Sequence, residues 1–135
     1  MDCVSVGIKY DYNIVVAVDL DGTLTKKDNF PNTYYEWNPK AIKWIKKIKK
    51  LKIILILWTC GTNSILDKKI KELQLMDVYF DYINDYSDIR GNSRKINADF
   101  YIDDRGNDGK ILWKKIYKKI KKLKKIRIKE YKNYK

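Results

Sequence analysis

The strongest constraint on the fold is an alternation between short apolar runs and amphipathic segments. Residues 14–18 and 53–58 are apolar and rich in β-branched side chains, which is typical of strands buried on both faces. Between them, the pair Asn38-Pro39 precedes isoleucines that recur at helical spacing among lysines, which predicts a capped amphipathic helix. Strands joined by helices are characteristic of a parallel sheet with helices covering it, so we expect an α/β fold.

The rest of the chain continues this alternation. It predicts a helix after a cap at Asn63 or Ser64, a strand at 78–83 that Asp81 weakens, a turn of helix at 93–97, a strand at 98–102 and a long helix after 109. A length of 135 residues suits one domain. We therefore expect a single domain, with a core at about 12–109 and a basic helix and tail at 110–135.

The net charge of +13 is concentrated at one end of the chain. From Lys110 onward there are thirteen basic residues and one acid, Glu130, whereas the first 109 residues carry 17 basic and 16 acidic side chains. A polycationic segment of this kind attracts polyanions such as nucleic acid. A second interpretation is compositional, because 26 of the 30 basic residues are lysine and the chain has the Ile, Lys, Asn and Tyr bias of an AT-rich genome. Both interpretations stay open at this point.

Composition also argues against several classes of protein. No apolar run approaches the roughly 20 residues of a membrane span, and residues 1–10 lack the pattern of a signal peptide. We therefore expect a soluble, cytoplasmic protein without a membrane partner. The two cysteines, Cys3 and Cys60, suggest neither a disulfide framework nor a zinc site. Because there is no histidine, acid–base catalysis would depend on carboxylates, lysine, tyrosine or a metal-bound water.

Polar side chains follow three of the predicted strands. Asp19 and Asp21 end the first, Thr59 follows the second, and Asp103 and Asp104 end the fourth. The carboxyl ends of parallel strands form a shared crevice, so we expect these groups to converge. Converging carboxylates repel one another unless a cation lies among them, and oxygen ligands without His or Cys favour Mg²⁺.

The motif Asp19-Leu20-Asp21-Gly22-Thr23 resembles the first signature of the haloacid dehalogenase (HAD) superfamily. Thr59 resembles the second signature, Lys95 the third and Asp103-Asp104 the fourth, in the expected order. More narrowly, LILWTCG and SRKINADFYIDDRGN resemble small, capless members from Bacteroidetes bacteria, phages and viruses. The resemblance covers residues 14–107 and implies a three-layer α/β/α Rossmann-like fold with a parallel sheet and minimal or no cap.

The resemblance also implies roles for these residues. Asp19 would be the nucleophile that forms an aspartyl phosphate, and Asp21 would be the general acid and base. Mg²⁺ would be bound by Asp19, by the main-chain carbonyl of Asp21 and by Asp103, with Asp104 as a further ligand or neighbour. The residues implied to contact the substrate phosphate are Leu20, Thr59, Cys60 and Lys95. The second aspartate, Asp21, distinguishes phosphatases from dehalogenases in this superfamily and argues against a carbon–halogen substrate.

These inferences predict a Mg²⁺-dependent phosphomonoesterase that acts on a small phosphate ester or on a nucleic-acid end. One alternative is a polynucleotide 3′-phosphatase guided by the basic tail, and another is a non-catalytic nucleic-acid-binding module. Tyr34, Tyr35 and Trp37 would stack on a base, or else cover the sheet edge and the first helix. Trp113 and Tyr117 are expected to be core contacts of the last helix. The sequence leaves the substrate and the oligomeric state open.

Overall fold

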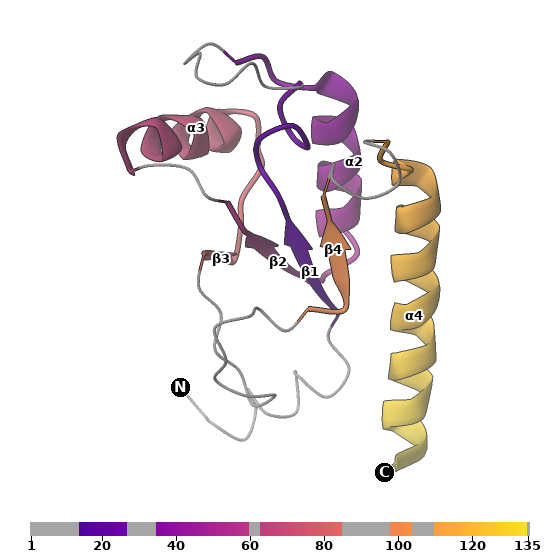
Figure 1. Ribbon diagram of the computed structural model, residues 1–135. Coiled ribbons are helices and arrows are strands. Elements are labelled where there is room, and N and C mark those ends of the chain that lie inside the picture. Colours follow the sequence, from indigo (N-terminus) through magenta and orange to yellow (C-terminus); the bar gives the residue numbers. More distant parts are fainter. Residues whose placement is uncertain (1–13, 27–34, 60–62, 85–97, 104–109, 135) are drawn as a thin grey trace, which may run out of the picture.

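The chain forms a four-stranded parallel sheet with helices packed against it (Figure 1). The computed structural model describes residues 14–26, 35–59, 63–84, 98–103 and 110–134. The strand order is β3-β2-β1-β4, formed by β1 (Val15–Val18), β2 (Ile54–Leu57), β3 (Tyr82–Ile83) and β4 (Phe100–Ile102). The helices of the described residues are α2 (Pro39–Lys49), α3 (Asn63–Leu75) and α4 (Trp113–Tyr134). The predicted α/β class and parallel sheet are confirmed.

The central strand β1 is buried on both faces, as its uninterrupted apolar sequence predicts. Val16 and Val18 point into the larger core cluster, whereas Val15 and Ala17 point to the opposite face, where they pack with Ile56. All four side chains of β1 are at most 3% exposed. This double burial explains why β1 shows no alternation of polar and apolar residues.

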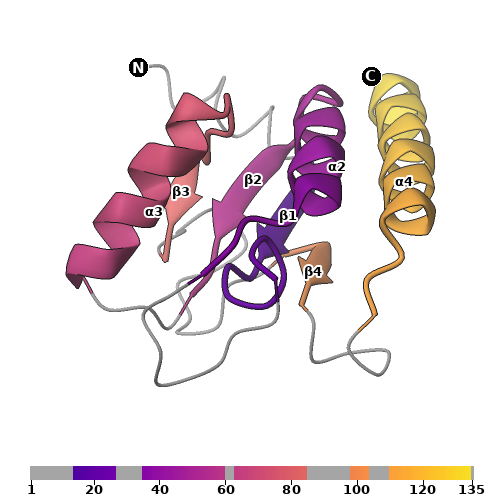
Figure 2. The ribbon, with the colours of Figure 1, turned by 90° about the horizontal axis from the view of Figure 1, so that it is seen from above.

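The three described helices contribute to the same core cluster, on the face of the sheet that carries Val16 and Val18 (Figure 2). Their buried side chains include Ile45 of α2, Leu73 of α3 and Ile120 of α4, each with 0% exposure. A second helical layer is not among the described residues, so the three-layer arrangement remains an expectation. None of the helices that the structure describes combines the length and apolarity of a membrane span.

Several element boundaries follow from hydrogen bonds of single side chains. The Asn38 side chain accepts from the N–H groups of Lys40 (3.1 Å) and Ala41 (3.3 Å), which confirms the predicted cap. Strand β3 is shorter than the predicted 78–83, because the Asp81 carboxylate accepts from the Leu55 N–H (2.8 Å) just before the strand begins. The turn of helix predicted at 93–97 lies outside the described residues. Helix α4 begins at Trp113, a few residues after the predicted start.

The aromatic residues at the start of α4 are core contacts, as predicted. Trp113 is 3% exposed and belongs to the main core cluster. Tyr117 packs on Trp44 of α2, with a distance of 5.7 Å between ring centroids. The apolar side of α4 is therefore occupied by α2 and the core.

The basic half of α4 is also anchored to the domain. Lys124 donates to the main-chain carbonyls of Leu51 and Lys52, which follow the end of α2. Burial and the neighbouring charge of Lys52 lower the pKa of Lys124. Farther along, the Arg127 guanidinium lies 2.5 Å from Asp99, whose other carboxylate oxygen accepts from the Val15 N–H (2.8 Å). The helix is thus an integral part of the fold.

The ion pair between α4 and Asp99 leads to a stability prediction. Arg127→Met is expected to lower the free energy of unfolding by about 2 kcal/mol, because a mostly buried carboxylate loses its charged hydrogen-bond donor. Urea denaturation followed by circular dichroism measures the change. The matched control is Lys129→Met on the exposed side of the same helix, with an expected change of at most roughly 0.5 kcal/mol. Equal destabilisation by the two variants would contradict the anchoring role of Arg127.

Candidate functional site

Asp19 and Asp103 directly follow two neighbouring strands, β1 and β4, at the carboxyl edge of the sheet. Val18 pairs with Leu57 of β2 and with Ile102 of β4. The ladder continues one residue further, because the Asp19 N–H donates to the Ile102 carbonyl at 2.9 Å. Adjacent strands lie about 4.8 Å apart, so Asp19 and Asp103 follow the ends of adjoining strands at the same level. Two of the predicted strand-end residues, Asp19 and Asp103, therefore lie at neighbouring strand ends.

The segment after Asp19 folds back as a tight turn. The Leu20 carbonyl accepts from the N–H groups of Thr23 (3.3 Å), Leu24 (2.9 Å) and Thr25 (3.3 Å). Gly22 has a φ of 81°, a conformation that glycine adopts without steric cost, and its N–H donates to Thr25 Oγ1 at 3.0 Å. The Leu20 side chain is 1% exposed and packs in the core. The turn is therefore fixed to the core directly beside the strand end.

A buried threonine contacts the Asp19 carboxylate. Thr23 is 1% exposed, and its Oγ1 donates to Asp19 Oδ2 over 3.4 Å. The long O–O distance makes this a weak hydrogen bond. The contact links the Asp19 side chain to the turn that follows it.

The two ends of the long loop after this turn are held together. Thr25 and Trp37 form an isolated antiparallel bridge, and the Lys26 N–H donates to the Glu36 carbonyl at 2.8 Å. The Asn38 N–H donates to the Leu24 carbonyl at 2.9 Å, so the start of α2 lies next to the turn that follows Asp19. Tyr34 and the rest of 27–34 lie outside the described residues.

Asp21 forms an ion pair that the sequence analysis did not predict. Lys69 Nζ of α3 lies 2.5 Å from Asp21 Oδ1, and the two side chains are 8% and 33% exposed, respectively. Lys69 is the one buried charged residue in the described part of the chain. The sequence does indicate that Lys69 is buried. Lys69 lies on the apolar face of its helix, which is otherwise formed by Leu66, Ile70 and Leu73.

The ring of Tyr35 lies against the same ion pair. Lys69 Nζ lies 4.7 Å from the ring centroid of Tyr35, and the Tyr35 ring meets that of Trp37 edge-on at 5.5 Å. The Tyr35 hydroxyl donates to the Glu72 carboxylate. Burial and this carboxylate raise the pKa of Tyr35 to about 12, so its hydroxyl stays protonated at neutral pH. Tyr35 and Trp37 therefore make internal contacts, which favours the covering interpretation over base stacking.

Thr59 is held at the carboxyl edge by Asn84, which the sequence analysis also did not predict. The Thr59 N–H donates to Asn84 Oδ1 at 2.7 Å, and the Asn84 N–H donates to the Leu57 carbonyl at 2.7 Å. Asn84 has a φ of 53°, in the left-handed region that asparagine tolerates better than most residues. An asparagine directly after a predicted strand is typical of a turn, so the sequence indicates a turn at this position.

The remaining predicted site residues, Cys60, Lys95 and Asp104, lie outside the described residues. Within the residues that are described, no group of three or more acidic or cysteine side chains is arranged to hold a metal ion. The described part contributes the carboxylates of Asp19 and Asp103 from adjacent strands. These are hard oxygen donors, which suit Mg²⁺ better than a softer transition metal.

Comparison with known proteins finds one family model and a solved structure that are similar to this chain. Residues 2–130 match a family model described as "Protein of unknown function (DUF705)", a range that includes most of α4. A solved structure of a conserved protein from Bacteroides thetaiotaomicron is 34% identical, with a TM-score of 0.67. The similarity covers 82% of this chain and 91% of that one. No curated protein matches the chain.

Proposed function

We propose a Mg²⁺-dependent phosphomonoesterase activity for this chain, which belongs to the DUF705 family of proteins of unknown function. The observation that carries the proposal is the position of Asp19 directly after β1, level with Asp103 directly after β4. Thr59, held by Asn84 after β2, adds a hydroxyl on the other side of β1. The order β3-β2-β1-β4 and these strand ends support the resemblance to the HAD superfamily. We therefore include a three-layer HAD fold in the proposal.

In the proposed reaction, Asp19 attacks the phosphorus atom of a phosphate monoester. A bond forms between an Asp19 carboxylate oxygen and phosphorus while the bond to the ester oxygen breaks, which gives an aspartyl phosphate. Asp21 donates a proton to the departing oxygen and later accepts one from the water that hydrolyses the intermediate. The products are an alcohol and inorganic phosphate, and Asp19 is regenerated.

Three groups would hold the magnesium ion: the carboxylates of Asp19 and Asp103 and the main-chain carbonyl of Asp21. When bound, Mg²⁺ offsets the repulsion between the nucleophilic carboxylate and the anionic substrate. Thr59 and Lys95 would stabilise the negative charge on the transferring phosphoryl oxygens by donating hydrogen bonds to them.

Lys69 is proposed as a positioning residue for Asp21. Its ammonium binds Asp21 Oδ1 and lies against the Tyr35 ring, so it restricts the orientation of the carboxylate. Holding Oδ1 leaves the other oxygen, Oδ2, to exchange a proton with the leaving group and with water. This arrangement favours a defined approach of Asp21 to the substrate, which is what acid catalysis requires.

The proposed activity is tested by a phosphate-release screen with Mg²⁺. The panel contains sugar phosphates, nucleotides and oligonucleotides with either a 5′- or a 3′-terminal phosphate. We expect release of inorganic phosphate from at least one class and its loss when the metal is removed with EDTA. Preference for the 3′-phosphorylated oligonucleotide would select the polynucleotide-end alternative. Absence of release from every substrate would contradict the enzymatic proposal.

A further inference from the structure

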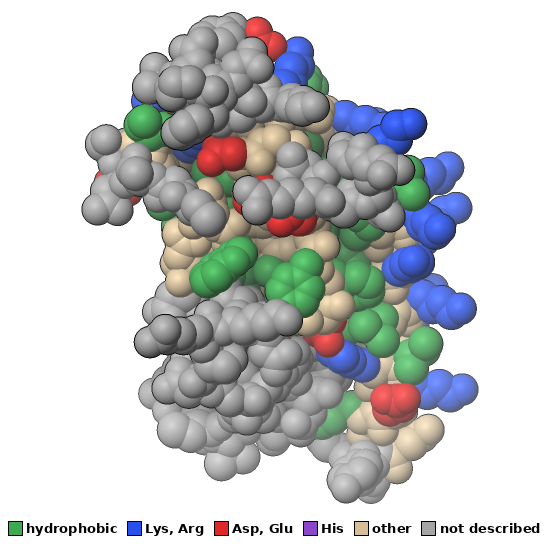
Figure 3. Space-filling model, in the orientation of Figure 1, with side chains coloured by type: hydrophobic (Ala, Val, Ile, Leu, Met, Phe, Trp, Pro, Cys, Tyr) green, Lys and Arg blue, Asp and Glu red, His purple; other side chains and the backbone are tan. Residues whose placement is uncertain are grey.

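Helix α4 presents a long row of exposed ammonium groups. Of its eleven basic residues, Lys124 and Arg127 bind within the fold. The other nine are exposed lysines at positions 114, 115, 118, 119, 121, 122, 125, 129 and 132. Glu130 is the single acid of the helix. Figure 3 shows basic side chains along the outer edge of the molecule, over α4.

The length and rigidity of this row suit an extended polyanion. A helix of 22 residues is about 33 Å long at 1.5 Å per residue. Its contacts with α2, with Leu51 and with Asp99 fix the helix to the domain along much of this length. The lysines are thus displayed on a preformed helix, so binding does not have to order the backbone that carries them.

The apolar face of α4 is not available for insertion into a lipid surface. Trp113 and Ile120 are at most 3% exposed within the core, and the large apolar side chain exposed on α4 itself is Ile126, at 43%. An amphipathic helix that binds membranes buries its apolar face among the acyl chains. Here that face contacts the rest of the domain, so the exposed lysines fit a charged polymer better than a bilayer.

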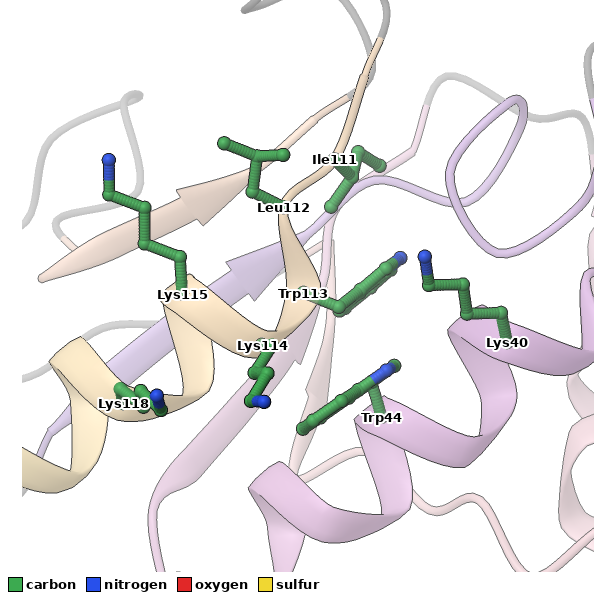
Figure 4. A pocket seen from close by; sticks show the side chains of 8 residues that line it. All are labelled: Lys40, Trp44, Ile111, Leu112, Trp113, Lys114, Lys115 and Lys118. Atoms are coloured by element: carbon green, nitrogen blue, oxygen red, sulfur yellow. The ribbon is translucent and has the colours of Figure 1, made fainter.

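A groove between α2 and α4 adds an apolar wall to this charged surface. Its volume is about 600 Å³, within the range of roughly 300–1,000 Å³ that ligand sites occupy. Trp44 and Leu112 supply apolar surface, with the buried Trp113 behind them, and Lys40, Lys115 and Lys118 supply charge (Figure 4). Leu112 is 49% exposed, so part of this wall is open to solvent. Such a combination suits a ligand with both phosphate groups and unpaired, flat bases.

We propose that the α4 surface, defined as the nine exposed lysines together with this groove, binds single-stranded nucleic acid. The lysines contact the phosphates, and the apolar wall of the groove contacts a base. A double strand keeps its bases stacked inside and offers none to the groove. The chemistry of the surface therefore favours the single-stranded form.

The groove lies at the same end of the molecule as the candidate site. Helix α2 begins next to the turn after Asp19, and α4 begins at the end of the sheet where β4 finishes (Figure 1). If the phosphatase proposal holds, a strand bound in the groove would have its end near Asp19. This consequence rests on the proposed function, whereas binding itself does not.

Binding is measured by fluorescence anisotropy with a labelled single-stranded oligonucleotide that has no terminal phosphate, in EDTA. The probe cannot be hydrolysed under these conditions, so failure of the phosphatase proposal leaves the result unaffected. The double variant Lys115→Gln/Lys118→Gln removes two lysines that line the groove. The plot of log affinity against log salt is expected to become shallower by about 1.4, which corresponds to roughly 25-fold weaker binding at 0.1 M salt.

The matched control is Lys68→Gln/Lys71→Gln on α3, which changes the net charge equally at two exposed lysines. Its affinity is expected to stay within about twofold of the parent. Equal weakening by both variants would show that only net charge matters and would overturn the assignment to α4. Linear polyphosphate that competes as well as the oligonucleotide at equal charge, or tighter binding to phosphatidylserine vesicles, would overturn the choice of nucleic acid. Circular dichroism checks that both variants are folded.

Discussion

Asp19→Asn is expected to abolish phosphate release while leaving the fold and oligonucleotide binding unchanged. An amide lacks the negative charge and the nucleophilicity of a carboxylate, so the aspartyl phosphate cannot form. Loss of a nucleophile lowers turnover by a factor on the order of 10⁴ to 10⁶. Initial rates with the best substrate of the screen measure the effect. Mass spectrometry of acid-quenched wild-type enzyme should also reveal one added phosphoryl group on the peptide that contains Asp19.

The substitution is a clean test because it preserves the size of the side chain. The amide oxygen that replaces a carboxylate oxygen can still accept the hydrogen bond from Thr23, so the turn at Leu20 has no reason to open. The matched control is Asp67→Asn on the exposed surface of α3, which removes the same charge away from the strand ends. Turnover that survives in Asp19→Asn, or that disappears equally in Asp67→Asn, would refute the role of Asp19.

The sequence predicts those parts of the fold in which local chemistry and tertiary structure agree. Strand β1 is recognisable because a strand buried on both faces must be apolar throughout, and the start of α2 because Asn38 caps it through neighbouring N–H groups. Strand β3 is predicted too long, since Asp81 bonds to Leu55 on another strand. The sequence analysis expects Asp81 to weaken this strand, but a hydrogen bond between distant residues leaves no local pattern, so the residue at which the strand begins could not be predicted.

The same distinction applies to the candidate site. The location of Asp19, Thr59 and Asp103 at one edge could be predicted because a parallel sheet brings the ends of its strands together, whatever the details of packing. Lys69 and Asn84 were missed because their partners depend on where α3 and the end of β3 lie. The sequence position of Lys69 nevertheless predicts that it has a partner, because a lysine that is buried with an apolar helix face needs a group to bind its charge.

Lys69→Met is expected to slow hydrolysis by impairing Asp21, without destabilising the protein. Methionine has a similar length but no charge, so Asp21 loses the ammonium that fixes its Oδ1 atom. An alkyl phosphate needs its leaving oxygen protonated, so its turnover should fall by about 100-fold, the lower end for general acid catalysis. An aryl phosphate with an acidic leaving group needs little protonation and should lose less than roughly 10-fold. Paired kcat measurements on the two esters show the difference.

Unfolding experiments separate this role from a structural one. Removal of one partner destabilises an ion pair that is fully buried, but Asp21 is 33% exposed and can be hydrated once Lys69 is replaced. Methionine also avoids the cost of keeping the ammonium of Lys69 out of water, since that side chain is only 8% exposed. We therefore expect Lys69→Met to be at least as stable as the parent in urea. The control Lys68→Met alters the neighbouring exposed lysine, whose Nζ lies 5.8 Å from the same Tyr35 ring, and should keep activity on both esters. An equal loss on the alkyl and aryl esters would indicate that Lys69 supports the fold of the site in general. A selective loss of kcat on the alkyl ester supports a role of Lys69 in proton transfer through Asp21, because the alkyl ester depends far more on protonation of its leaving oxygen than the aryl ester does.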